Sequence, residues 1–349
     1  MKECYDSEKK KKYTQKLREI QKELPEFCGE FFRGIENNTS ILTRFGYAVD
    51  LRTFFTYLIN EVDLFSGCEI RNIKLSDLDK ITVTQLEIFL EYLTLYMKED
   101  KEIINQERAK ARKLSTLRSF YKYFIKKGKL SSNAPQLIDL PKLHQKSIIR
   151  LEPNEVADLL DTAEDGKGLS ETQKKYNKLT RKRDVAILTL FLGTGIRISE
   201  LVGLDMDDIN FMSNEFLITR KGGNQDTLVF GEETRKALLD YFLERETIRP
   251  EPGHENALFL SLQRKRIGAR SVENLVKKYS SLAVPLKKIS PHKLRSTYGT
   301  MLYRETGDIY LVADILGHKD VNTTKKHYAA ISEDRRKIAA NVIKLREDD

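Results

Sequence analysis

Apolar residues recur every three to four positions through most of the first 130 residues of the chain. This spacing places them on one face of a helix, and it predicts four helical segments, at about residues 10–33, 39–60, 82–98 and 105–127. Pro25 interrupts the first segment, and Thr39 is a candidate N-cap of the second. The inward face of the second segment consists of Phe45, Val49, Phe54, Phe55 and Leu58. This part of the chain is therefore expected to be an all-α module.

The helical period ends after Lys129, where the chain continues as SSNAPQLIDLPKLHQKS. Clustered Ser, Asn and Pro without a sustained apolar period are typical of a linker. We therefore predict a helical domain at residues 1–134, a linker at residues 135–150 and a second domain at residues 151–349.

The second domain combines two apolar patterns. Residues 216–219 and 227–230 are short β-like runs, and the residues between them include Gly222 and Gly223, which favours a β-hairpin. Helical spacing predicts helices elsewhere, at residues 154–162 after Pro153 and at residues 182–192, 232–245, 271–282, 292–305, 309–316, 322–330 and 332–344. The expected fold class is mainly α, with a small antiparallel sheet in the second domain.

Composition excludes several classes of protein. Hydrophobic residues make up 40% of the chain and charged residues 32%, as in a globular protein and unlike a disordered one. No run approaches the ~18 apolar residues of a membrane span, and the N-terminus lacks the apolar segment of a secretory signal. Three cysteines without a CxxC spacing argue against a disulfide framework or a zinc–thiolate site. We expect a cytoplasmic protein.

Positive charge is concentrated near the linker. The net charge is +9, but residues 105–150 hold twelve Lys or Arg against two acids, so this segment alone carries +10. In residues 105–127 basic and apolar side chains alternate at helical spacing, so one face packs on a core while the other presents charge. We expect that face to bind DNA phosphates; the alternative is a face that contacts only solvent. The predicted contact residues are Arg108, Lys110, Arg112, Lys113, Arg118, Lys122, Lys126 and Lys127.

The last half of the chain holds candidate anion-binding residues. His292 and Arg295 are three apart in PHKLR, at the start of a predicted helix, so both project from one face near its positive end. Such a pair suits a phosphate, although HxxR by itself also occurs for structural reasons. Arg197 lies between two isoleucines in GTGIRISEL and needs an anionic partner if it is buried. That partner is either a bound phosphate or Glu200, three residues later.

Five motifs occur in one order: GTGIRISEL, TRKGG on the predicted hairpin, PHKLR, LGHKDVNTT, and a Tyr ten residues after His318. Together they resemble the catalytic signature of the tyrosine recombinases, the Xer and phage-integrase group. The resemblance covers the whole chain and implies a helical core-binding domain followed by a catalytic domain. Two positions depart from it. Many members place the Tyr nine residues after the second His, where this chain has His327, and Ser296 stands where a His often follows the PHxLR arginine.

The resemblance implies a site-specific DNA recombinase, acting in integration and excision or in chromosome dimer resolution, that works through a 3′-phosphotyrosyl intermediate and a Holliday junction. Two guanidinium groups would bind the scissile phosphate, a hairpin lysine would protonate the leaving 5′-oxygen, and a tyrosine would attack phosphorus. The catalytic residues it implies are Arg197, Lys221, His292, Arg295, His318 and the nucleophile Tyr328, with Glu200 supporting the first arginine.

No cofactor or metal is expected, because the arginines supply the charge that Mg²⁺ supplies elsewhere and the sequence has no HExxH or Walker A motif. The expected partners are double-stranded DNA held in a two-domain clamp, further copies of the chain, and an accessory directionality protein. The copies would form a dimer on one site and a cyclic tetramer in the synapse. Residues 332–344 would dock on a neighbouring copy; the alternative is that they cap their own domain.

Two other functions use the same residues. A type IB topoisomerase-like enzyme would nick and close the same strand with the same Arg, Lys, His and Tyr chemistry. A DNA-binding regulator would keep the basic surface and carry an inactive site. The filled catalytic positions argue against the regulator, and the helix expected after Tyr328 argues against the topoisomerase.

Overall fold

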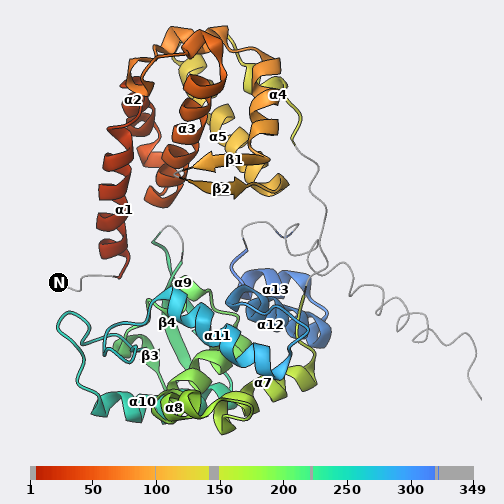
Figure 1. Cartoon of the computed structure of the whole chain (residues 1–349). Helices are drawn as coiled ribbons and strands as arrows, with labels where there is room; N and C mark the ends of the chain where they lie inside the picture. Colours follow the sequence, from red (N-terminus) through yellow and green to blue (C-terminus); the bar gives the residue numbers. More distant parts are fainter. Residues whose placement is uncertain (1–4, 99, 141–148, 221–222, 319–320, 322–349) are drawn as a thin grey trace, which may run out of the picture. The chain divides into compact units, whose positions relative to one another are not determined.

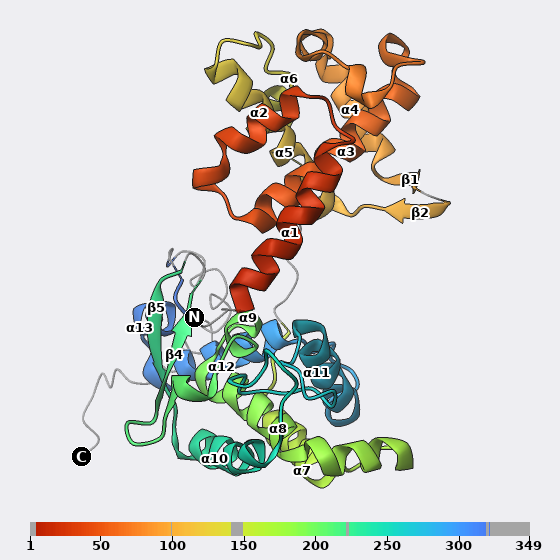
Figure 2. The ribbon, with the colours of Figure 1, turned by 90° about the vertical axis from the view of Figure 1, so that its left-hand side faces the viewer.

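The computed structural model describes residues 5–98, 100–140, 149–220, 223–318 and 321 of the chain. Two compact units make up the molecule, Met1–Lys146 and Ser147–Asp349. Figures 1 and 2 show the elements of each unit from two directions. The division between the units falls within the predicted linker, residues 135–150.

The first unit is mainly helical. Its α-helices are α1 (Tyr5–Gln21), α2 (Phe27–Gly34), α3 (Ile41–Glu61), α4 (Val83–Tyr92), α5 (Glu107–Lys126) and α6 (Ala134–Leu137). Four short 3₁₀ helices span Glu36–Asn38, Asp63–Phe65, Ile70–Asn72 and Leu75–Lys80. The N-cap of α3 is Ser40, whose hydroxyl accepts a hydrogen bond from the Thr43 N–H at 3.2 Å. Thr39 is therefore not the cap, because its hydroxyl donates to the Ile35 carbonyl instead.

A small β-hairpin makes the prediction of an all-α module wrong. The helix expected to reach residue 98 ends at Tyr92, and β1 (Leu95–Lys98) pairs antiparallel with β2 (Lys101–Ile104). Asp100 makes the turn with a positive φ of 61°. The Asn105 amide donates to the Leu93 carbonyl at the end of α4, so a side chain after the hairpin satisfies a carbonyl that the helix leaves unpaired.

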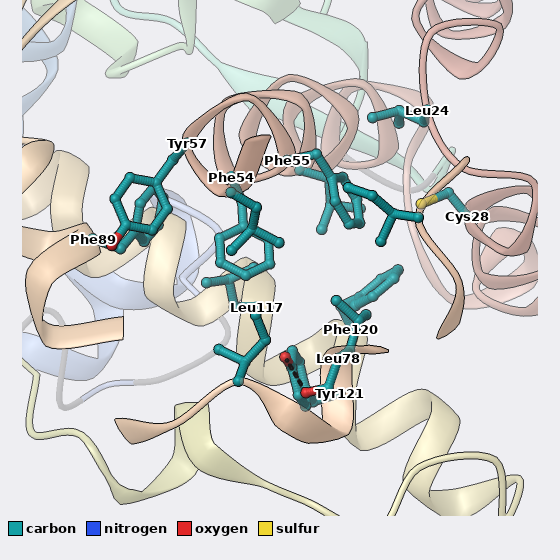
Figure 3. Close-up of a cluster of buried hydrophobic side chains, with 14 of the residues drawn as sticks. Leu24, Cys28, Phe54, Phe55, Tyr57, Leu78, Phe89, Leu117, Phe120 and Tyr121 are labelled. Atoms are coloured by element: carbon teal, nitrogen blue, oxygen red, sulfur yellow. Dashed lines mark hydrogen bonds between the residues drawn. The ribbon is translucent and has the colours of Figure 1, made fainter. Parts of the chain in front are cut away.

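Aromatic side chains form the core of the first unit. Phe54 on α3 packs edge-on against Phe89 on α4, with ring centroids 5.2 Å apart. Phe120 on α5 is fully buried and packs edge-on against Phe55 on α3 (Figure 3). The Tyr121 hydroxyl donates to the Leu78 carbonyl at 3.2 Å, the dashed contact in Figure 3. These contacts fix the rotation of α5 about its axis and so decide which of its basic residues face solvent.

The second unit surrounds one long helix, α8 (Glu171–Thr194), whose C-terminal half is buried. Its helices are α7 (Pro153–Asp165), α8 (Glu171–Thr194), α9 (Ile198–Leu201), α10 (Glu232–Thr247), α11 (Ala269–Ala283), α12 (Pro291–Thr306) and α13 (Ile309–Ile315), with a 3₁₀ helix at Met206–Asp208. The α8 helix packs against α7, α10 and α12 (Figures 1 and 2). It begins eleven residues before the predicted 182–192 segment, because Ser170 and Gln173 form a capping box at its N-terminus.

A three-stranded antiparallel sheet confirms the expected small sheet. Its order is β3 (Ile209–Asn210), β4 (Glu215–Thr219) and β5 (Gln225–Val229). The β4–β5 register ends with Thr219, the first residue of the TRKGG motif, opposite Gln225. The helices expected at residues 322–330 and 332–344 lie outside the described residues. Among the helices that the structure describes, none is long and apolar enough to cross a membrane.

Candidate active site

Arg197 begins α9 directly after the long helix α8. Gly195 ends α8 in the left-handed conformation, with φ of 63°, and a Cβ there would overlap the ring of Tyr298 on α12. The glycine therefore allows α12 to approach the end of α8. The sharp turn places Arg197 at the N-cap of α9, where its side chain is 32% exposed.

Glu200 holds Arg197 by two contacts. Its carboxylate, only 2% exposed, accepts from the Arg197 backbone N–H at 2.9 Å and from Nη1 at 2.8 Å. The sequence left a choice between this ion pair and an external anion as the partner of Arg197. The ion pair exists, and it leaves the Nη2 group of Arg197 for other acceptors.

The two arginines of the motifs meet at the end of α13. Arg197 Nη2 donates to the carbonyl oxygens of Leu316, at 3.1 Å, and Gly317, at 2.9 Å. Arg295, on α12 and 5% exposed, donates through Nη2 to the same Leu316 oxygen and through Nη1 to the Gly195 carbonyl. The C-terminal end of a helix carries partial negative charge, so it attracts both guanidinium groups. Two residues that are far apart in the sequence are thereby brought together.

The two histidines lie on either side of Arg295 along the chain. His292 is the second residue of α12, one turn before Arg295, and it is exposed. His318 follows Gly317 directly, is partly buried, and donates its backbone N–H to the Ala313 carbonyl at 2.8 Å. The Gly317 carbonyl that binds Arg197 is therefore adjacent in sequence to His318. Lys221 and Tyr328, the predicted acid and nucleophile, lie outside the described residues.

Arg220 is a neighbour of the site that the sequence analysis did not select. It follows the last residue of β4, and its guanidinium donates to the Asp226 carboxylate, to the Ile315 carbonyl at 3.2 Å and to the Leu316 carbonyl at 3.3 Å. The signal in the sequence was its position directly before Lys221 in TRKGG. Three arginines therefore donate to one carbonyl oxygen, that of Leu316.

Apart from Lys113, the predicted contact residues on α5 and at its C-cap, Lys127, divide into three groups. Arg108, Lys122, Lys126 and Lys127 are exposed. Two more form ion pairs. The half-exposed Arg112 pairs with the buried Asp50. The Lys110 side chain is 13% exposed, and its Nζ lies 3.7 Å from Glu107 Oε1. Arg118 donates to the carbonyls of Pro135 and Ile138, which ties the segment around α6 to α5.

Lys113 requires a correction, because it does not lie on the DNA-facing surface that the sequence predicts. Its side chain is 7% exposed, and Nζ donates to the Asn105 amide oxygen at 3.1 Å and lies 4.0 Å from the Asp50 carboxylate. Burial lowers the pKa of this ammonium group below its usual value, and burial likewise raises the pKa of Asp50. Lys113 is therefore part of the interior of the first unit.

In the part of the chain that the structure describes, no group of three His, Cys, Asp or Glu side chains has a geometry that suits a metal ion. The positive charge at the end of α13 comes from guanidinium groups. An arrangement of this kind binds and polarises a phosphodiester through bidentate, charge-assisted hydrogen bonds.

Comparison with known proteins identifies relatives of this chain. A model of the phage integrase family matches residues 149–335. The chain is 34% identical over 309 residues to tyrosine recombinase XerC of Caldanaerobacter subterraneus subsp. tengcongensis, covering 84% of this chain and 79% of the relative. It is 28% identical over 349 residues to tyrosine recombinase XerS of Streptococcus uberis, covering 92% and 96%.

Solved structures share the fold. The XerH site-specific recombinase bound to palindromic difH substrate, in a post-cleavage complex, aligns with a TM-score of 0.64 and 21% identity, covering 87% of this chain and 81% of that one. The Tn1549 transposon integrase (aa 82–397), in complex with circular intermediate DNA, aligns with a TM-score of 0.61 and 19% identity, covering 86% and 94%.

Proposed function

This chain belongs to the phage integrase family of tyrosine recombinases and is an enzyme that cleaves and rejoins DNA at specific sites; we propose that Tyr328 is its nucleophile and that Arg197 and Arg295 bind the scissile phosphate. The observation that carries this proposal is the meeting of the two guanidinium groups at the Leu316 carbonyl, next in sequence to Gly317 and His318. It concentrates positive charge from two helices at one place in the catalytic unit.

The arginines act on the charge that develops during attack. A guanidinium group has five N–H donors, and the described contacts of Arg197 engage one hydrogen of Nη1 and the Nη2 group. We assign its Nε–H to a non-bridging oxygen of the phosphate. This hydrogen bond strengthens as negative charge builds in the pentacoordinate transition state, and only such differential binding accelerates the step.

The proposed bond changes balance as a transesterification. The Tyr328 oxygen forms a bond to phosphorus as the bond to the 5′-oxygen breaks, and His292 assists removal of the phenol proton. Lys221 donates a proton to the leaving 5′-oxygen, and His318 donates a hydrogen bond to the phosphate. The phosphotyrosyl ester retains the free energy of the broken ester, so a 5′-hydroxyl from the partner strand reverses the reaction and rejoins the DNA through a Holliday junction.

Assembly, partners and location complete the proposal. Double-stranded DNA is the substrate, and each of the two units contacts the same duplex, the first through the exposed basic residues of α5. Two copies bind one site and four form a cyclic synapse, using the segment after Tyr328, and an accessory protein sets the direction. The predicted domain bounds, residues 1–134 and 151–349 with a linker between them, remain part of this proposal, as does a cytoplasmic location.

A nicked target site from which the leaving fragment diffuses away tests the nucleophile. Wild type should accumulate a 3′-linked covalent complex that resists SDS. Tyr328→Phe should bind DNA with little loss of affinity and form no complex, while the matched neighbour variant His327→Ala should still form it at a reduced rate. A complex formed by Tyr328→Phe, or its complete loss in a folded His327→Ala, contradicts the assignment. Recombinant products from plasmids with two sites separate strand exchange from simple nicking and closing.

A further inference from the structure

Arg220 joins the hairpin to the rest of the catalytic unit. On the hairpin, its backbone N–H donates to the Asn224 carbonyl at 2.7 Å, and its Nε donates to the Asp226 carboxylate at 2.6 Å. Across to the end of α13, its Nη groups donate to the carbonyls of Ile315 and Leu316. The Arg220 side chain is only 12% exposed, so its contacts to the end of α13 are partly shielded from water, whereas the Asp226 carboxylate is 47% exposed.

The structure around Gly317 accommodates this side chain closely. Gly317 has a positive φ of 56°, and a Cβ at this position would overlap the Arg220 guanidinium. Glycine suits this position because of its backbone conformation, and a side chain here would require the Arg220 guanidinium to move. The Leu316 oxygen that Arg220 binds also accepts from Arg197 and Arg295. One carbonyl thus links the hairpin to both proposed phosphate-binding arginines.

We propose that Arg220 is a positioning residue that sets the place of Lys221 relative to the phosphate bound by Arg197 and Arg295. The inference rests on the proposed role of Lys221 as general acid. A general acid must come within hydrogen-bonding distance of the leaving oxygen, about 3 Å. Lys221 lies outside the described residues, but it is joined to Arg220 by one peptide bond. Fixing Arg220 by backbone and side chain therefore fixes the point in the chain from which Lys221 continues.

The contact pattern favours this role over a simple ion pair within the hairpin. The pair between Arg220 and Asp226 would hold the two strands together without any contact to α13. The two donors to the α13 carbonyls add nothing to the hairpin itself, and they connect it to the arginine pair. Removing Arg220 should therefore disturb proton donation by Lys221 and leave phosphate binding by Arg197 and Arg295 in place.

A DNA substrate with sulfur in place of the bridging 5′-oxygen separates these two effects. When the Tyr328 oxygen forms its bond to phosphorus, the phosphorus–sulfur bond breaks and its electron pair leaves on sulfur. A thiol has a pKa near 8.5, far below that of an alcohol, so the thiolate leaves without a proton and no general acid is needed. The rate of covalent complex formation is measured in single turnover with saturating enzyme, on the oxygen and sulfur substrates.

On the oxygen substrate, Lys221→Ala should slow the reaction about 10²- to 10⁴-fold and Arg220→Ala about 10- to 100-fold. On the sulfur substrate, both variants should react within a few-fold of wild type, whereas Arg295→Ala should stay slow on both. Arg220→Lys, which keeps the charge but cannot reach all three acceptors, should fall between wild type and Arg220→Ala. Arg264→Ala, which removes a surface ion pair to Glu251, is the matched control and should react like wild type on both substrates.

Each outcome decides the proposal. If both Arg220 variants are slow on the two substrates alike, Arg220 supports phosphate binding or folding, and the proposal is wrong. If both react like wild type on the oxygen substrate, Arg220 has no positioning role. If Lys221→Ala is not rescued by sulfur, the general-acid role of Lys221 fails, and with it the basis of this inference. Rescue of Lys221→Ala without rescue of the Arg220 variants overturns the inference about Arg220 alone.

Discussion

Arg197 and Arg295 lie on different helices and donate hydrogen bonds to the same carbonyl oxygen, that of Leu316. The carbonyl belongs to the end of α13, where the helix leaves its last acceptors without intrahelical partners. Both guanidinium groups are therefore oriented by the protein itself before DNA binds. Orientation in advance lowers the reorganisation required when charge develops on the phosphate.

Replacing either arginine by lysine should impair chemistry more than binding. Lysine keeps the charge but loses the planar, bidentate donor set. By analogy with loss of one oxyanion donor, Arg197→Lys and Arg295→Lys should each slow covalent complex formation about 10²- to 10³-fold. The dissociation constant for the target site, measured in parallel, should change only a few-fold. Arg270→Lys, at an exposed ion pair, serves as the control; a matching rate loss there would contradict the assignment.

Removal of the Glu200 carboxylate should both destabilise the catalytic unit and slow cleavage. Glu200→Ala leaves the Arg197 backbone N–H and Nη1 without the acceptors that Glu200 provides. This should lower the free energy of unfolding by about 2 kcal/mol. The loss is smaller than for a fully buried ion pair, because Arg197 is partly exposed to solvent. Glu200→Gln keeps one acceptor oxygen and should lose less. Urea unfolding measures the stability. A Glu200→Ala protein as stable and as active as wild type would show that the pair orients nothing.

The exposed lysines of α5 should set the salt dependence of DNA binding. Replacing Lys122, Lys126 and Lys127 by Ala should weaken binding to all sequences and flatten the slope of log K against log salt by nearly one unit for each lost phosphate contact. Lys113→Met is the matched control, because this lysine is buried. It should lower stability and leave the slope unchanged. An unchanged slope in the triple variant would mean that these lysines contact only solvent.

Asp50 should give the first unit a distinct pH dependence. Burial raises the pKa of its carboxyl above the unfolded value of about 3.9. The folded state then binds the proton more tightly, so the stability from this group is present below the unfolded pKa and is lost as pH rises through the folded pKa. Wild type should therefore lose stability relative to Asp50→Asn as pH rises above about 4, as measured by urea unfolding across pH. If the stability of wild type stayed constant or rose relative to that of Asp50→Asn as pH increases, the predicted sign would be wrong.

Truncation before Ser332 should separate DNA binding from assembly. Residues 332–349 lie outside the described residues, but Ile338, Val342 and Leu345 are spaced to form an apolar stripe on a helix. The truncated chain should bind a single half-site like the full-length chain, and it should assemble and exchange strands poorly. Gel-shift titration and recombination of a two-site plasmid measure the two steps. Recombination at the full-length rate would show that the segment is dispensable.

The local pattern of the sequence was sufficient to predict the fold class and to find the five motifs of the family. Helical spacing located most of the described helices, and the three-residue separation of Arg197 and Glu200 offered their ion pair as one of two alternatives, which is the one that the structure shows. These features depend on neighbours within one or two turns, which the sequence displays directly. Recognition of the family followed from the order of five motifs, and the comparisons confirm it.

Packing between distant segments decided the rest. The rotation of α5 in the aromatic core buries Lys113 and exposes Lys122, although both are lysines on a basic helix. The bend of the chain after α4 produced a hairpin that helical spacing did not predict. The convergence of Arg197, Arg220 and Arg295 on Leu316 depends on how α9, α12, the hairpin and α13 pack. Burial and long-range hydrogen bonds depend on which surfaces meet, and a local period in the sequence carries no information about the partner.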